Sequence, residues 1–243
     1  MAGRPVSLRR VESPRGSDGP RSGERLAGGE GRRFSREYAA ALLSGDEVAA
    51  EITIREAIDA SLTTAQIDDE LIAPALGLVG DLWQRGEISV ADEHLATEIS
   101  LRVLALQREA VRTARAPGGH KVMLATPAAE LHTVALRMSS NLLREAGYET
   151  VMLGPDVPPG SLACCARRHE SDVICLSSTM AGGGDQVLIA IHEVHQQRPA
   201  AGFIVGGRGI TSRLRSLPGI EVCDRVSEVV EAVDAIAQRA DMN

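Results

Sequence analysis

Residues 121–135 read KVMLATPAAELHTVA, and the pattern that begins here indicates the class of fold. It opens on a short apolar run, Lys121–Ala125, which gives way at once to small, polar and turn-forming residues. A run of this length between turn signals is typical of a strand that is buried on both faces. Similar runs, each followed by a helix-like segment, occur at Thr150–Leu153, Val173–Leu176, Gly202–Val205 and Ile220–Cys223. Strands that alternate with helices predict an α/β domain with a doubly wound, five-stranded parallel sheet.

The chain before this stretch has a helical pattern instead. Apolar residues recur at helical spacing from residue 34 to residue 115, which predicts about four helices packed as a bundle. Thr63 or Thr64 can cap one helix, Pro74 should lie early in it or kink it, and Ser89 should begin the last one. The turn-rich residues 116–119 then predict a linker between a bundle domain at 34–115 and the α/β domain at 120–240.

Residues 1–33 are rich in Gly, Pro, Ser and Arg and have almost no apolar periodicity. We therefore expect a disordered tail. The tail contains eight arginines against four acidic residues, whereas the whole chain has a formal net charge of −7. A solvated leader and a basic arm for an acidic partner both remain as interpretations of this segment.

The overall composition argues against several classes of protein. An acidic chain with only 2% aromatic residues is a poor candidate for direct nucleic-acid binding. No stretch reaches the roughly 20 apolar residues of a membrane span, and no apolar signal peptide begins the sequence. The four cysteines form no CxxC pair, which favours reduced thiols and a cytoplasmic protein.

Parallel sheets of this class bind ligands at the carboxyl ends of their strands. The loop after the first predicted strand contains Glu130 and His132, the loop after the third reads Ser177-Ser178-Thr179, and the loop after the fourth contains Gly206-Gly207. Between Ala135 and Ser177 lie 41 residues, and between Thr179 and Gly206 lie 26.

These three loops resemble the cobalamin-binding signature of methionine synthase and the B12-dependent mutases. That signature is an acidic residue, any residue, His, two residues and Gly, then Ser-x-Leu, then Gly-Gly, and both intervals agree with it. The resemblance implies a flavodoxin-like, B12-binding domain at 120–240. Two positions depart from the signature, because Ala135 replaces Gly and Thr179 replaces Leu. We expect these changes to alter affinity rather than to abolish binding.

The resemblance also implies a role for each position. His132 would be the lower cobalt ligand, in place of the cofactor's own dimethylbenzimidazole, and Glu130 would accept a hydrogen bond from its other nitrogen. Ser177 would bind the benzimidazole, and Gly206-Gly207 would leave room for the nucleotide tail. Further cofactor contacts are expected from the same loops, at Leu131, Thr133, Val134, Ser178 and Thr179.

A second pattern lies in the helical half, where Trp83 is followed by nine residues and then by Glu93-His94. It resembles the Trp-x9-Glu-His motif of the cobalamin photoreceptors, whose best-known members are light-sensing MerR-type regulators. The resemblance implies that the bundle caps the upper face of adenosylcobalamin or methylcobalamin. Trp83 would pack against the upper axial group, Glu93 would contact it, and His94 is the candidate upper cobalt ligand after light. We then expect the bundle and the α/β domain to meet only through the corrin and the linker.

The two resemblances cover residues from about 34 to 240 and include no DNA-binding module. Purple-bacterial cobalamin-binding antirepressors, which bind a separate transcription factor, have this plan. We therefore predict a non-enzymatic sensor, responsive to light or B12, that acts on a protein partner in transcription control and does not itself bind DNA. Homo-oligomers are compatible with this plan. The alternatives are a corrinoid shuttle protein of a methyltransferase system, whose cobalt Trp83 would obstruct, and a cobalamin storage or delivery module.

Overall fold

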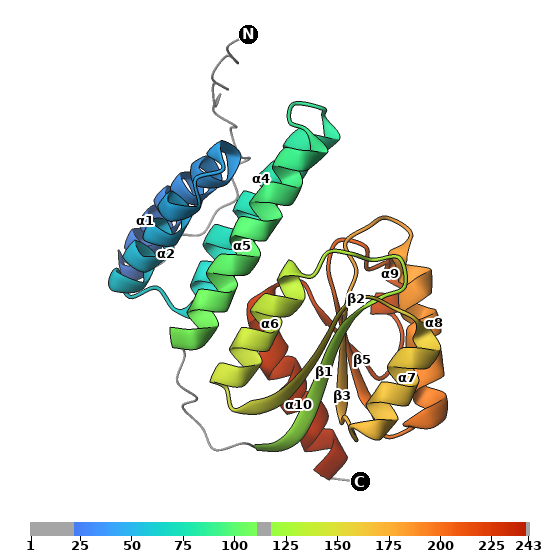
Figure 1. The fold of residues 1–243 in the computed structure, drawn as a ribbon. Coiled ribbons are helices and arrows are strands. Elements are labelled where there is room, and N and C mark those ends of the chain that lie inside the picture. The colour runs from blue at the N-terminus through green and yellow to red at the C-terminus, as the bar shows by residue number, and fades with distance from the viewer. Residues whose placement is uncertain (1–21, 111–117, 242–243) are drawn as a thin grey trace.

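The computed structural model describes residues 22–110 and 118–241, which form a helical part and an α/β part (Figure 1). Along the chain, the helical part consists of α1 (Ser22–Ser44), α2 (Glu47–Asp59), α3 (Thr64–Gln66), the π-helix η1 (Ile67–Ile72), α4 (Ala73–Gln84) and α5 (Val90–Ala110). We call this part the cap. Its helices match the predicted bundle.

The α/β part contains a single sheet of five parallel strands in the order β2-β1-β3-β4-β5. The strands are β1 (Gly118–Pro127), β2 (Tyr148–Val157), β3 (Val173–Ser177), β4 (Gly202–Gly206) and β5 (Ile220–Cys223). The connecting helices are α6 (Val134–Glu145), α7 (Pro159–Arg168), α8 (Gly183–Gln197), α9 (Ser212–Arg215), the 3-10 helix η2 (Val226–Glu228) and α10 (Val229–Asp241). The predicted parallel sheet and its five strands are confirmed.

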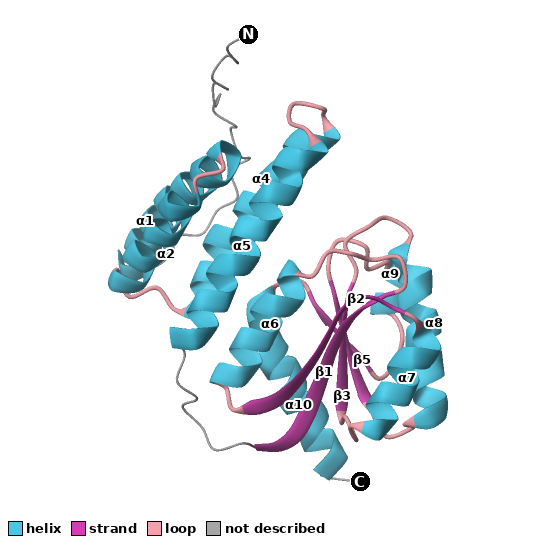
Figure 2. Ribbon diagram, viewed as in Figure 1, coloured by secondary structure: helices cyan, strands magenta, loops and turns pink. Residues whose placement is uncertain are grey.

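Helices cover both faces of the sheet, which explains why the strand sequences are apolar throughout (Figure 2). Val122 and Leu124 of β1 face α6 and α10, where they join one buried cluster. Met123 and Ala125, the alternate residues, face α7 and α8 in a second cluster. Successive side chains of a strand point to opposite faces, so a strand between two helical layers buries every residue.

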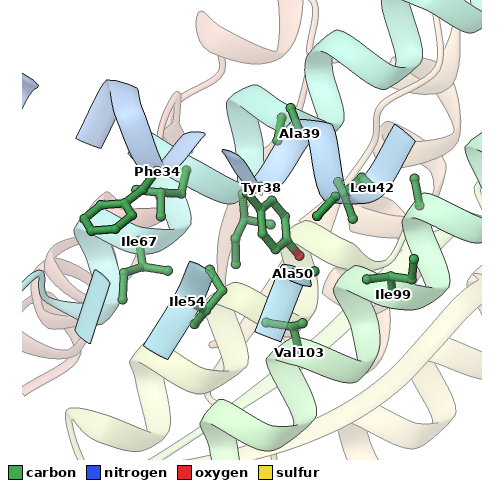
Figure 3. Close-up of a cluster of buried hydrophobic side chains, with 14 of the residues drawn as sticks. Phe34, Tyr38, Ala39, Leu42, Ala50, Ile54, Ile67, Ile99 and Val103 are labelled. Atoms are coloured by element: carbon green, nitrogen blue, oxygen red, sulfur yellow. The ribbon is translucent and has the colours of Figure 1, made fainter. Parts of the chain in front are cut away.

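The cap has its own apolar core, built where α1, α2, η1 and α5 meet (Figure 3). Phe34 and Tyr38 are its largest side chains and are almost completely buried. The Tyr38 hydroxyl, which cannot reach water there, donates to Ser100 Oγ at 3.1 Å. A buried hydroxyl without such a partner would cost free energy, so this bond allows a tyrosine in the core.

Local signals fix the beginnings of the cap helices. Thr63 and Gln66 form a reciprocal capping box, and the Ser89 hydroxyl caps α5 by accepting from the amide of Asp92 at 3.2 Å. Pro74 has no N–H to donate to the carbonyl of Glu70, and the helix turns in π geometry just before it. The predicted caps at Thr63 and Ser89 and the early position of Pro74 are therefore confirmed.

The helical part begins earlier than expected. α1 starts at Ser22, so the prediction of a tail without regular structure is wrong for residues 22–33. Extending an existing helix costs far less than nucleating one, and the anchored turns from Phe34 onward allow this extension. Residues 1–21 of the predicted tail, 111–115 of the predicted bundle and 116–117 of the predicted linker lie outside the described residues, and Gly118 and Gly119 belong to β1.

The cap and the α/β part pack directly against each other, with α5 beside α6 (Figure 1). Met138 of α6 belongs to the apolar core of the cap. The Asn141 side chain donates to the carbonyl of Leu104 at 3.0 Å, and Asp69 of η1 accepts from the amide of Val226 at 3.0 Å. The expectation that the two parts meet only through a corrin and a linker is therefore wrong, because α6 also carries apolar residues on the side that faces the cap.

Two further observations bear on the predicted surroundings of the protein. All four cysteines lie among the described residues, where they form no disulfide. None of the described helices combines the length and the apolar content that crossing a membrane would need.

Candidate functional site

The loop between β1 and α6 is held in a defined shape by the end of β2. Ala129 adopts a left-handed conformation, with φ of 65°, and its amide donates to Asp156 Oδ1 at 2.7 Å. The carbonyl of Glu130 accepts from the amide of Asp156 at 3.0 Å and from the Thr126 hydroxyl. These bonds fix the backbone that presents the side chains of Glu130 and His132.

The Glu130 carboxylate joins two of the three predicted loops. Its Oε2 accepts from the amides of Thr179 and Met180, at 2.6 and 3.0 Å, in the loop after β3. Its Oε1 accepts from the amide of His132 at 3.0 Å and lies 2.5 Å from His132 Nδ1. Glu130 is only 2% exposed, so these four contacts replace the water that it loses.

These contacts set the ionisation of both side chains. Burial alone would raise the pKa of Glu130, but the hydrogen bonds from His132 and from the amides of Met180, His132 and Thr179 outweigh it and lower this pKa to about 2. The hydrogen bond to Glu130 raises the pKa of His132 against the opposing effect of burial, and the charges of Glu130 and Glu93 raise it further. Glu130 is thus an ionised acceptor across the neutral pH range.

The remaining nitrogen of His132 is available for a ligand. Its Nδ1 is engaged by Glu130, and the side chain is 43% exposed. A histidine that donates Nδ1–H to a carboxylate is held in the tautomer whose Nε2 lone pair can bind a metal, and the carboxylate makes that nitrogen more basic. The structure therefore supports the predicted pairing of Glu130 with His132.

The loops after β3 and β4 are packed against each other. The amide of Ser178 donates to the carbonyl of Gly206 at 3.0 Å, and the Ser178 carbonyl accepts from the amide of Gly209 at 2.9 Å. At Gly207, φ is 103°, and a Cβ atom would lie 2.2 Å from the Ser178 carbonyl oxygen. Gly207 is thus required by the approach of Ser178, whereas the resemblance implied that the glycine pair makes room for the nucleotide tail.

Ser177 differs from its neighbours because its hydroxyl is not used within the protein. The residue is 5% exposed, and its Oγ is buried without a hydrogen-bond partner among the described residues. A buried hydroxyl usually has a partner, since leaving it unpaired costs about 1–3 kcal/mol. Ser177 therefore offers a hydrogen bond to a ligand at the edge of the sheet.

The second sequence pattern lies where α4 ends and α5 begins. Trp83, 38% exposed, lies at the end of α4, and Glu93-His94 lie in the first turn of α5. Glu93 Oε2 lies 2.6 Å from His94 Nδ1, and Glu93 Oε1 accepts from Thr97 at 3.1 Å. Because the Glu93 charge raises the pKa of His132, the carboxylate lies within electrostatic reach of that imidazole. Glu93 of the second pattern and His132 of the first thus interact through their charges.

The other predicted contact residues are placed less uniformly. Leu131 is 69% exposed on the β1–α6 loop, and Thr133 precedes α6 without forming a side-chain cap. Val134 packs against the apolar core of the cap. Thr179 contributes its backbone amide to Glu130. Their contacts with a cofactor remain predictions.

Comparison with protein families agrees with this geometry. A family model described as a B12 binding domain matches residues 120–235, and a second model with the same description matches residues 35–106. This chain is a B12-binding protein. The two matches correspond to the α/β part and to the cap, which we call the two halves of the B12-binding protein from here on.

Known proteins that are similar to this B12-binding protein include a transcriptional repressor and a corrinoid protein. The HTH-type transcriptional repressor CarH of Myxococcus xanthus is 25% identical over 210 residues, which cover 84% of this chain and 66% of the repressor. The chain therefore spans just under two thirds of that relative's length. The structure of the Methanosarcina barkeri monomethylamine corrinoid protein aligns with a TM-score of 0.73 at 13% identity, covering 84% of this chain and 98% of that one. This second likeness confirms the fold, a helical cap followed by a Rossmann-like domain.

The side chains at the edge of the sheet fit a corrinoid. Ser177 has an unpaired buried hydroxyl, and His132 has a free ring nitrogen set by Glu130. No group of three or more His, Cys, Asp or Glu side chains in the described part of the chain could hold a bare metal ion. A single imidazole suits a metal that arrives already bound in a macrocycle, as cobalt does in B12.

Several residues of this site could not be predicted from the sequence patterns. Asp156 and Thr126 fix the loop of Glu130. The amide of Met180 donates a hydrogen bond to the Glu130 carboxylate. Asp156 carried a usable signal, because an acidic residue ends a strand at the edge where ligands bind. The roles of Thr126 and Met180 depend on backbone positions that no residue type reveals.

Proposed function

We propose that this B12-binding protein is a regulator that responds to light or to B12 and acts on a protein partner in transcription control. The observation that carries this proposal is the Glu130–His132 pair, with His132 Nδ1 2.5 Å from Glu130 Oε1, in a chain whose cap also carries Trp83, Glu93 and His94. We propose that this cap group lies opposite the lower ligand, His132, when cobalamin is bound. Such a group covers a cofactor instead of leaving it open to a substrate.

The residues have separate roles in this proposal. His132 would hold the cobalt from below through Nε2, Ser177 would bind the nucleotide base, and Trp83 and Glu93 would contact the upper axial group. The bound cofactor would supply a cobalt–carbon bond that light can break. His94, whose side chain is 72% exposed, is the proposed upper ligand after that event. No residue is assigned a catalytic step, so the proposed protein is not an enzyme.

A change at the cofactor would reach a partner through the cap. Trp83 and Glu93 would lose their contacts with the upper group when that group leaves, and the populations of cap positions would shift. The partner is proposed to be a protein because the chain has a net charge of −7, which opposes the phosphate neutralisation that DNA binding requires. The similarity to the CarH repressor supports a role in transcription.

A corrinoid shuttle protein is the second candidate. The fold shared with the monomethylamine corrinoid protein motivates it, although that likeness concerns the fold alone. A shuttle must expose its cobalt to a methyl donor and a methyl acceptor. The cap group of this chain would have to move away for each transfer, which makes the regulator the better supported of the two.

The test is an absorption spectrum of the full-length protein loaded with adenosylcobalamin in the dark and then exposed to green light. We expect a dark spectrum of the base-off, His-on type in the wild type and in His195→Ala, an exposed histidine on α8 that serves as the control. His132→Ala should weaken binding and remove the histidine nitrogen coupling from the EPR spectrum of the Co(II) form. A wild-type EPR spectrum with only benzimidazole nitrogen would refute the role of His132.

The light step separates the two candidate functions. The regulator predicts a stable photoproduct in which His94 is a ligand, so His94→Ala should give a different, aquo-type spectrum after light and an unchanged spectrum before it. Identical photoproducts in both proteins would exclude His94 as the upper ligand. Methyl transfer with an added corrinoid methyltransferase, together with the lack of a stable photoproduct, would favour the shuttle.

A further inference from the structure

The cap is held to the α/β half by contacts of very different strength on two sides. On one side lie the α5–α6 and η1–η2 contacts, with the buried hydrogen bond from Asn141 to Leu104. There the Asp69 carboxylate, 7% exposed, accepts from the amide of Val226 and lies 3.4 Å from Arg225 Nε. Buried, backbone-directed contacts of this kind are costly to break.

On the other side, the contact consists of exposed side chains. Arg208 follows Gly206-Gly207 at the end of β4 and extends to α4, where its Nη1 lies 3.6 Å from Asp81 Oδ1. The two side chains are 64% and 54% exposed. An exposed ion pair of this geometry contributes between nothing and about 1 kcal/mol.

Gly77 of α4 leaves room for the Arg208 guanidinium beside the helix. A Cβ atom on Gly77 would lie 3.0 Å from Arg208 Nη2, so a larger residue would push the guanidinium away from the helix. Asp81 and Gly77 are one turn apart and thus lie on the same face of α4. Glycine inside a helix costs roughly 0.5–1 kcal/mol relative to alanine. Gly77 therefore gives the guanidinium close access to the helix at a cost in helix stability.

The position of this contact relates it to the B12 site. Arg208 belongs to the loop that contains the Gly206-Gly207 pair, and Asp81 lies two residues before Trp83. The pair thus connects the two halves at the edge where the signature residues of both meet. A corrin that enters between the halves must separate them on one side, and the side held by Arg208 and Asp81 costs least to open.

We propose that the Arg208–Asp81 pair is a latch on a hinged cap, which opens to admit and release cobalamin while the η1–η2 and α5–α6 contacts stay closed as the hinge. The inference rests on cobalamin binding by this chain. It adds the direction from which the cofactor enters and the residues that set the rate of exchange.

The test is the rate of cobalamin association and dissociation, followed by stopped-flow absorbance. Arg208→Ala and Asp81→Ala should each speed both association and dissociation by about two- to fivefold, as expected for losing an exposed ion pair. The proposal has the latch open only during entry and exit and re-form beside the bound corrin, so the dissociation constant should change little. The double variant should match the single ones, and the charge-swapped pair Arg208→Asp with Asp81→Arg should restore wild-type rates. Arg215→Ala, which removes the exposed pair with Asp224 inside the α/β half, is the matched control and should leave both rates unchanged.

A measurement on the apoprotein tests the latch independently of cobalamin binding. In the apoprotein, amide hydrogen exchange in α4 should be faster in Arg208→Ala than in the wild type, with α6 unchanged. Unaltered exchange and unaltered rates would overturn the latch. Faster dissociation with a weaker affinity and an unchanged association rate would also overturn it, because Arg208 would then be a contact of the bound cofactor.

Discussion

Glu130 determines the geometry of the site at the scale of single residues. Sequence patterns predicted it as the partner of His132 alone. The structure adds the amides of Thr179 and Met180, so one carboxylate positions both the imidazole and the loop after β3. Loss of its charge should therefore affect the imidazole and that loop together.

We predict that Glu130→Gln removes an acid-dependent part of the stability. The pKa of Glu130 in the folded protein is about 2, below its ordinary value of 4.5, so its stabilising contribution is present above pH 4.5 and is lost as the pH falls toward 2. This contribution amounts to about 3 kcal/mol. Urea unfolding across this pH window should show it in the wild type and in Glu149→Gln, an exposed control, but not in Glu130→Gln. NMR titration should also show a lower pKa for His132 in Glu130→Gln. Equal pH slopes for the wild type and Glu130→Gln would contradict the role of Glu130.

Asp68 is the opposite case, a carboxyl group that the fold holds without a partner. It lies in the π-helix η1, is completely buried, and neither carboxyl oxygen has a hydrogen-bond partner within the described residues. Burial, and then the charges of Asp69 and Glu145, raise its pKa from 3.8 to about 8. Asp68 is therefore a neutral acid at neutral pH.

We predict that Asp68→Asn stabilises the protein, increasingly so with rising pH. A pKa raised by folding means that stability is full below pH 3.8 and falls as the pH rises through about 8. The amide has no proton to lose, so the advantage of the variant should grow by about 1.4 kcal/mol per pH unit and level off above pH 8. Urea unfolding at several pH values measures this gain. Asp69→Asn, the neighbouring control, should instead lose stability, since Asp69 binds Val226 and Arg225. No gain at pH 8 for Asp68→Asn would show that the carboxyl group finds a partner in solution.

At the scale of elements, Gly207 shows how the loop after β4 depends on its neighbour. We predict that Gly207→Ala is far more destabilising than Gly219→Ala. Both glycines have positive φ, 103° and 80°, so alanine brings a strain of about 1–2 kcal/mol at each. Only at Gly207 would the added atom also meet the Ser178 carbonyl, whereas nothing lies within 4 Å at Gly219. Thermal unfolding of the two variants compares the costs. Similar losses would mean that the loops after β3 and β4 can move apart.

The same scale shows which elements the sequence could predict. The central strands were found because a run buried on both faces is apolar at every position. Their ends were not, since β1 continues to Pro127 and β2 to Val157 through polar and turn-forming residues that pair only in the folded sheet. The start of α1 at Ser22 was missed because it depends on extension of an anchored helix.

The candidate site, too, could be predicted from the sequence only in part. Spacing along the chain predicted that three loops would meet, because the carboxyl ends of parallel strands share one edge of the sheet. Side-chain types predicted the pairing of Glu130 with His132. The bond from Ala129 to Asp156 and the contact from Arg208 to Asp81 join residues whose approach depends on how β2 and the cap are placed, which no local pattern encodes.

At the scale of the whole molecule, the two halves share a core. Met138 of α6 is buried in the apolar cluster of the cap, whereas Leu162 of α7 is buried on the far side of the sheet. A side chain shared in this way couples the unfolding of both halves.

We predict that Met138→Ala and Leu162→Ala each destabilise the cap and the sheet together, by about 2–5 kcal/mol. Trp83 is the only tryptophan and lies in the cap, so its fluorescence reports on that half, while far-UV circular dichroism reports on the whole chain. Both signals should shift to lower urea by the same amount in each variant. Leu162→Ala with an unshifted Trp83 transition would show that the halves unfold independently.

The position of Met138 also has a consequence for exchanging parts between proteins of this architecture. The covalent connection between the halves runs through residues 111–117, but the packing boundary follows the surface of α6, inside the second half of the sequence. A chimera cut at the connection would pair this cap with a foreign helix and leave the hole for Met138 unfilled. A successful graft must carry the outward-facing residues of α6 along with the cap, so for recombination the module is larger than the continuous segment that folds into the bundle.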